Sequence, residues 1–126
     1  MTNFEIIAIV NAYEDRKAKG TTLTLPAAIA WTRRLNLDKL YRAKSIIDEA
    51  MREIMTQYSD DTHSTEENGQ RKVRPEYIAE FAKDQAEILS QETDVAIKKI
   101  HIEDLGEINL SDSDMDTLAF MLEEEA

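Results

Sequence analysis

The residues with the clearest capacity for chemistry are carboxylates near the C-terminal end of the chain. Asp112, Asp114 and Asp116 alternate with other residues, and Glu123 stands at the twelfth position of the run, which is the ligand spacing of an EF-hand calcium loop. The sixth position lacks the glycine that such a loop needs for its turn. Ser111 and Asp114 instead fit a capping box at the start of a helix. We therefore expect a helix N-terminus at this point and no metal site.

A second group of polar residues could ligate a divalent ion. Asp60, Asp61 and His63 lie within four residues, but nothing nearby in the sequence supplies a supporting shell. The chain has two histidines and no cysteine, so thiolate ligands, disulfides and cysteine nucleophiles are excluded. No serine, histidine and aspartate stand in a recognisable catalytic pattern. We expect a protein without enzymatic activity, metal or cofactor.

A basic stretch precedes the middle of the chain, and basic residues beside aromatic ones are typical of nucleic-acid binding. The formal net charge of the whole chain is −11, which would repel phosphate. We therefore expect no direct contact with nucleic acid and a place in the core for the nearby tryptophan. The residues concerned are Trp31, Arg33, Arg34, Lys39, Arg42 and Lys44.

The negative charge is concentrated in the second half of the chain. Residues 1–58 hold seven acids and nine bases, whereas residues 59–126 hold 19 acids and six bases. Part of this charge has a structural explanation in helix caps, and the acids of 123–125 fit a solvated end. The remaining cluster is a candidate surface for a basic partner, and its members are Asp60, Asp61, Glu66 and Glu67.

The elements that position these residues follow from hydrophobic periodicity and from capping signals. The chain of 126 residues has the size of one domain. We predict a mainly α (α+β) fold, with an N-terminal helix, a long antiparallel αα-hairpin, a small β element and a short C-terminal helix. The predicted helices are 3–19, 26–58, 75–91 and 112–123; the predicted strand is 94–102, and 59–74 is a mobile acidic loop with a tight turn at Asn68-Gly69.

The long second helix carries one apolar stripe that should face the core. Its members recur at spacings of three, four or seven, and they are Leu37, Leu40, Ile47, Met51, Ile54 and Tyr58. On the third helix the predicted inward residues include Ile78 and Phe81. Leu35, Ile46 and Met55 lie off the main stripe of the second helix. These three residues are candidates for a self-association or partner surface.

The segment beginning at Leu25-Pro26 resembles an uncharacterised family of small phage and prophage proteins, a domain of unknown function. The run LPAAIAWTRRLNLDKL carries the resemblance, with its Leu-Pro helix start followed by Trp31, Asn36 and Leu40. The order of the later elements also matches, up to a closing pattern around Leu118 and 120–122. Arg33 departs from the family pattern, which has an apolar residue there. The resemblance implies a phage or prophage origin and an α-rich fold, and it transfers no catalytic residues.

Two functions from different classes remain open. The first is a non-enzymatic phage accessory protein that acts by protein–protein contact, in virion or tail assembly, with a phage structural or assembly protein or a second copy of itself as partner. The alternative is an acidic inhibitor of a host defence nuclease complex, of the anti-CRISPR or anti-restriction type, that occupies a basic nucleic-acid channel. No leader-like or membrane-spanning apolar run is present. We expect the cytoplasm of the bacterial host, or the virion, as its location and no membrane partner.

Overall fold

The computed structural model describes residues 1–123 and has a mainly α (α+β) fold. Within that range there are four α-helices, two short 3₁₀ segments and one two-stranded antiparallel sheet. The elements are α1 (Asn3–Ala18), α2 (Ala27–Gln57), β1 (Ser64–Glu67), β2 (Gln70–Val73), α3 (Pro75–Ser90), η1 (Ile102–Leu105), α4 (Asp112–Leu118) and η2 (Ala119–Met121). The predicted ends of the first three helices agree with these bounds to within one residue.

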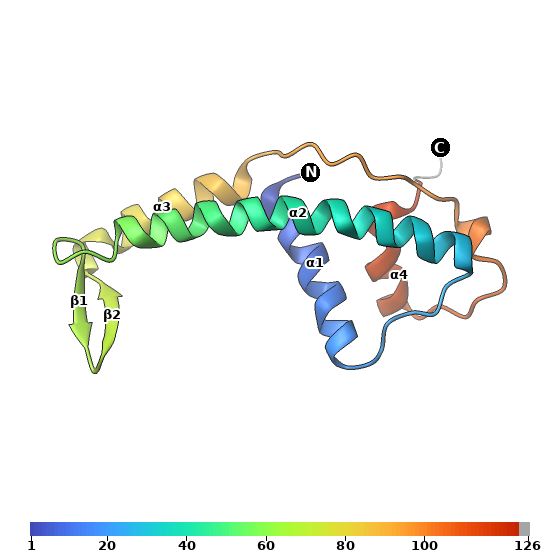
Figure 1. Ribbon diagram of the computed structural model, residues 1–126, viewed down its shortest axis with the longest axis horizontal. Helices are drawn as coiled ribbons and strands as arrows, with labels where there is room; N and C mark the ends of the chain where they lie inside the picture. The colour runs from blue at the N-terminus through green and yellow to red at the C-terminus, as the bar shows by residue number, and fades with distance from the viewer. Residues whose placement is uncertain (124–126) are drawn as a thin grey trace.

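Helix α2 is the axis on which the other elements are arranged (Figure 1). It has 31 residues and is therefore about 46 Å long at ~1.5 Å per residue. Figure 1 shows α1 and α4 on one side of α2, whereas α3 runs beside its C-terminal half and the β1–β2 hairpin projects from its end. We call residues 48–90 the arm and the remaining described residues the body.

The body contains two clusters of buried apolar side chains. The first lies between α1 and α2, and its buried members are Ile6, Val10, Leu37, Leu40 and Ile47. The second joins the start of α2 to the C-terminal elements, and its buried members are Leu25, Ile29, Ile100, Leu105, Leu118 and Met121. Five members of the predicted inward stripe of α2 are buried, namely Leu37, Leu40, Ile47, Ile54 and Tyr58, and the sixth, Met51, is half-buried. In contrast, α3 has no fully buried residue, and the helices that it packs against are α2 and α1.

Local signals explain where the helices begin and end. The Thr2 hydroxyl accepts a hydrogen bond from the backbone N–H of Glu5 at the start of α1. At its end, Gly20 takes a φ of +67°, and the N–H groups of Gly20 and Thr21 close a Schellman motif. Pro75 occupies the first turn of α3, where its missing N–H costs nothing.

The capping box predicted at the start of the last helix is confirmed. The Ser111 hydroxyl accepts from the Asp114 N–H at 3.1 Å, and the Asp114 carboxylate accepts from the Ser111 N–H at 3.1 Å. The predicted helix 112–123 is too long, because α4 ends at Leu118 and continues only as the 3₁₀ segment η2. Of the acids predicted to be solvated at 123–125, the last two lie outside the described residues.

The predicted strand at 94–102 is wrong, although its backbone is extended. Residues 93–101 run back along α2 (Figure 1) and form no strand; their one backbone bridge within the described residues joins Ile100 to Leu122, and side chains of α2 bind other backbone groups of the segment. The Asn36 amide donates to the Lys98 carbonyl at 2.9 Å and accepts from the Lys98 N–H at 2.8 Å. The Lys39 ammonium donates to the Ala96 carbonyl at 2.7 Å. Asn36 thus fastens this segment to α2, and the helix is continuous through this position.

The sheet forms instead in the segment predicted as a mobile acidic loop, 59–74. Ser64 pairs with Val73 and Glu67 with Gln70, which leaves a two-residue turn. The tight turn predicted there is confirmed, since Asn68 and Gly69 have φ angles of +51° and +76°. Positive φ at both central positions fits a type I′ hairpin turn, for which Asn-Gly is the preferred pair.

Candidate protein-contact surface

The end of the arm is held by a cluster of four rings. Tyr58 of α2 is buried, and its ring centroid lies 5.0 Å from that of Phe81 and 5.3 Å from that of His63. The His63 ring lies 4.6 Å from that of Tyr77. The Tyr58 hydroxyl donates to the Asp84 carboxylate at 2.7 Å, and this bond, followed by burial, raises the pKa of Tyr58 to about 12. The cluster fixes how the hairpin sits on α2 and α3.

Polar contacts complete the attachment of the hairpin. The buried Ser64 donates from its N–H and its hydroxyl to the Asp60 carbonyl, at 2.9 and 2.8 Å. The Arg74 N–H donates to the His63 carbonyl at 2.7 Å, and its guanidinium donates to the Asp61 carbonyl at 2.9 Å. The β1–β2 hairpin is therefore attached to the arm at its base, through Ser64 and Arg74.

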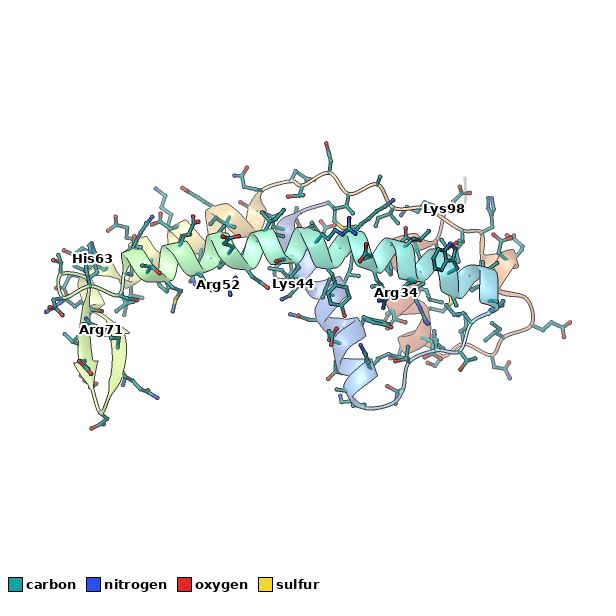
Figure 2. All side chains as sticks on the ribbon, in the orientation of Figure 1. Arg34, Lys44, Arg52, His63, Arg71 and Lys98 are labelled. Atoms are coloured by element: carbon teal, nitrogen blue, oxygen red, sulfur yellow. The ribbon has the colours of Figure 1, made fainter. Side chains whose placement is uncertain are left out.

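The first two acids of the cluster are engaged within the hairpin. The Asp60 carboxylate lies 2.6 Å from His63 Nδ1 and accepts from the His63 N–H at 2.9 Å. These hydrogen bonds, with the ring contact as the largest cause, lower the pKa of Asp60 below its ordinary value. The Asp61 carboxylate pairs with the Arg71 guanidinium at 3.1 Å. Figure 2 shows Arg71 on the hairpin, near the loop that carries His63. Both carboxylates thus support the local structure.

The other two acids face bases across the sheet. Glu66 stands opposite Arg71 in the register, and the Glu67 carboxylate lies 3.4 Å from the Lys72 ammonium. Segment 59–74 holds four acids and three bases, so its formal charge is only −1. The structure brings the four predicted acids together at the tip of the arm, but it places bases among them. The sequence reading missed this because the bases come after the turn.

The predicted apolar candidates are exposed, but they form more than one surface. The exposed fractions of Leu35, Ile46 and Met55 are 42%, 71% and 50%. At ~100° per residue, Leu35 and Ile46 lie about 20° apart around α2, whereas Met55 lies about 180° from Ile46. Met55 therefore lies on a different side of α2 from the other two residues.

Within residues 1–123, four large exposed apolar residues lie outside the predicted candidates, namely Phe4, Trp31, Ile78 and Ile102. Trp31, expected in the core, is 64% exposed, and Ile78, expected to face inward from α3, is 53% exposed. The signal for Trp31 was available, because it stands nine residues from the buried Leu40 and hence about 180° away around the helix. Trp31 lies one turn before Leu35 on the same side of α2. We call Trp31, Leu35 and Ile46 the outer stripe.

The remaining candidate chemistry has structural explanations. The Asp114 carboxylate lies 2.6 Å from the Arg16 guanidinium, and this contact is the largest cause of a lowered pKa of Asp114. Among residues 1–123, no group of three or more histidine, aspartate or glutamate side chains could hold a metal ion. The helices of the same region include none that is long and apolar enough to cross a membrane.

Comparisons of this chain with known protein families, curated proteins and solved structures find no match.

Proposed function

We propose that this chain is a phage or prophage accessory protein that acts by protein–protein contact in the host cytoplasm, or in the virion, and carries out no catalysis. The partner is a phage structural or assembly protein, and the outer stripe of α2 is the contact surface. The phage origin rests on the resemblance of segment 25–40 and of the later element order to the phage family. The contact function rests on the geometry of α2.

The observation that carries the proposal is the exposure of Trp31, Leu35 and Ile46 on one side of one long helix. They lie within about 60° of its circumference, and two of them are more than 60% exposed. Burying a large apolar side chain contributes about 1.5–3 kcal/mol. Tryptophan is also enriched among the residues that dominate interface energies. A helix face of this kind fits an apolar groove on a partner.

The acidic-inhibitor function is the second candidate, and the paired charges at the tip make it the weaker one. A phosphate mimic needs carboxylates that are free to meet a basic channel. Asp61 and Glu67 each already have a basic partner within the hairpin, and Asp60 is hydrogen-bonded to the His63 ring. The acidic residues in the rest of the second half of the chain, outside residues 59–74, favour this function.

Photo-crosslinking in host cells that produce the phage tests the proposal. A benzophenone amino acid replaces Leu35 or Ile46, and in a matched control it replaces Lys83, which is exposed on α3 away from the outer stripe. We expect adducts with one phage structural or assembly protein from the two stripe positions and none from the control. A further probe at Glu66 addresses the alternative.

Adducts with a host nuclease complex from Glu66, and none from the stripe, would replace the proposal by the inhibitor function. Equal labelling from the stripe and from Lys83 would show that the outer stripe is not a contact surface.

A further inference from the structure

The body contains a cavity of about 290 Å³ that the contact proposal does not use. It lies between α1, the connection to α2, the first turns of α2 and the α4–η2 segment, and Figure 1 shows α1 and α4 on the same side of α2. Its walls are mainly apolar and include Ile9, Tyr13, Leu37, Leu118 and Phe120. This cavity is separate from the outer stripe, because none of the three stripe residues lines it.

The cavity is close in size to the smallest pockets that bind small molecules. Such pockets begin at about 300 Å³. The space corresponds to about ten waters at ~30 Å³ each. Waters there would find few hydrogen-bond partners, because most of the lining side chains are hydrocarbon. The walls suit an apolar occupant.

Two arginines line the cavity, and they differ in what they already bind. Arg16 is engaged by the Asp114 carboxylate and the Ser113 hydroxyl, each at 2.6 Å. Arg33 donates one N–H to the Leu23 carbonyl at 3.1 Å, and its guanidinium lies 5.8 Å from the Tyr13 ring centroid. A guanidinium has five N–H donors.

Arg33 therefore keeps donors for a ligand. Within residues 1–123 no carboxylate forms an ion pair with it, although Arg16, Arg42 and Arg71 each have one. Asp116 also lines the cavity, but it is exposed, so its charge is screened by water and salt. The half-buried Arg33 is the cation that an anionic group entering the cavity would meet.

We propose that this cavity binds a small amphipathic carboxylate. The apolar body of the ligand occupies the space between α1 and α4, and its carboxylate accepts charge-assisted hydrogen bonds from Arg33. The proposal concerns a ligand of the body and stands independently of the contact function assigned to the outer stripe.

Titration with octanoate, followed by two-dimensional NMR of the isotope-labelled chain, tests the proposal. We expect saturable shifts of the amides of Ile9, Tyr13 and Phe120. Octanol and octylamine have the same eight-carbon length as octanoate but a different head group. Their affinities should be lower by about tenfold or more. Absence of saturable shifts with octanoate overturns the proposal, and equal or tighter binding of octylamine overturns the assignment of a carboxylate.

Two variants locate the ligand. Arg33→Met should weaken octanoate binding by about tenfold or more and leave octanol binding unchanged. The control is Arg34→Met, which changes an exposed neighbour that does not line the cavity and should leave octanoate binding unchanged. Ala12→Phe, at an exposed lining position where a larger side chain can enter the space, should abolish binding with the fold retained by circular dichroism. Wild-type affinity in a folded Ala12→Phe protein, or equal effects of the two arginine variants, contradicts the assigned site.

Discussion

Replacement of Asn36 by leucine should loosen the extended segment 93–101 from α2. Asn36 is completely buried, and its amide makes two hydrogen bonds with the backbone of Lys98, at 2.9 and 2.8 Å. Leucine has nearly the same shape and neither donor nor acceptor. The substitution therefore removes both hydrogen bonds with little change in packing volume.

The expected loss follows from those two bonds. A typical intramolecular hydrogen bond contributes about 0.5–1.5 kcal/mol net, so Asn36→Leu should lower the free energy of unfolding by about 2 kcal/mol. Lys98 is exposed, so water can replace part of the lost hydrogen bonding to its backbone. The expected loss of unfolding free energy is therefore no larger than this value. The control is Asn11→Leu, at an exposed position of α1, where a change within about 0.5 kcal/mol is expected.

Urea unfolding measures the difference through the midpoint and the m-value. Amide hydrogen exchange should show faster exchange of the Lys98 N–H in the variant, with the α1–α2 amides unchanged. A loss below about 0.5 kcal/mol, equal to that of the control, would refute the reasoning that Asn36 holds the segment in place.

Three further predictions follow from local contacts. Because the Arg16 contact lowers the pKa of Asp114, the pair stabilises the fold above the ordinary carboxyl pKa, and this stability is lost as pH falls through the lowered value; Asp114→Asn should remove that part of the acid-unfolding curve. Gly69→Ala places a side chain at φ +76° with open space around it, so we expect about 1 kcal/mol of local destabilisation, read as faster proteolysis within 64–73. The Tyr58 phenol should ionise near pH 12, and in Asp84→Asn closer to its ordinary value, as ultraviolet titration of tyrosinate would report.

The helices could be predicted because their signals are local. Thr2, Pro75 and Ser111 begin helices through their own side-chain or backbone geometry, and apolar periodicity defines the buried face of α2. Gly20 likewise ends α1 within a single turn. Each of these features is encoded within a few residues, so no knowledge of distant contacts is needed.

The position of the sheet could not be predicted in the same way. Val95 and Ile97 alternate with exposed neighbours as in a half-buried strand, and the buried Ile100 follows after one additional residue. Such a pattern indicates which side is buried and does not indicate what pairs with the backbone. Here the Lys98 backbone pairs with the Asn36 side chain, 62 residues earlier in the chain, and the Ile100 backbone pairs with Met121 and Glu123.

Only part of the candidate surface could be predicted, because part of it depends on contacts between distant residues. The exposure of Leu35 and Ile46 follows from their angle to the buried stripe, and the same angle places Trp31 on the outer side. The angle does not explain Met55, which lies about five whole turns after the buried Leu37 and is nevertheless 50% exposed. The neutralisation of the acidic cluster depends on the hairpin register, which brings Arg71 and Lys72 back beside acids that precede the turn.

The affinity of the crosslinked partner for stripe variants tests the central claim most directly. Isothermal titration would compare Ile46→Glu with Ser45→Glu, since these exposed neighbours receive the same charge about 100° apart around α2. We predict that Ile46→Glu raises the Kd by about tenfold or more, with Ser45→Glu near wild type. Equal Kd values for the two variants and the wild type would contradict a contact through the outer stripe.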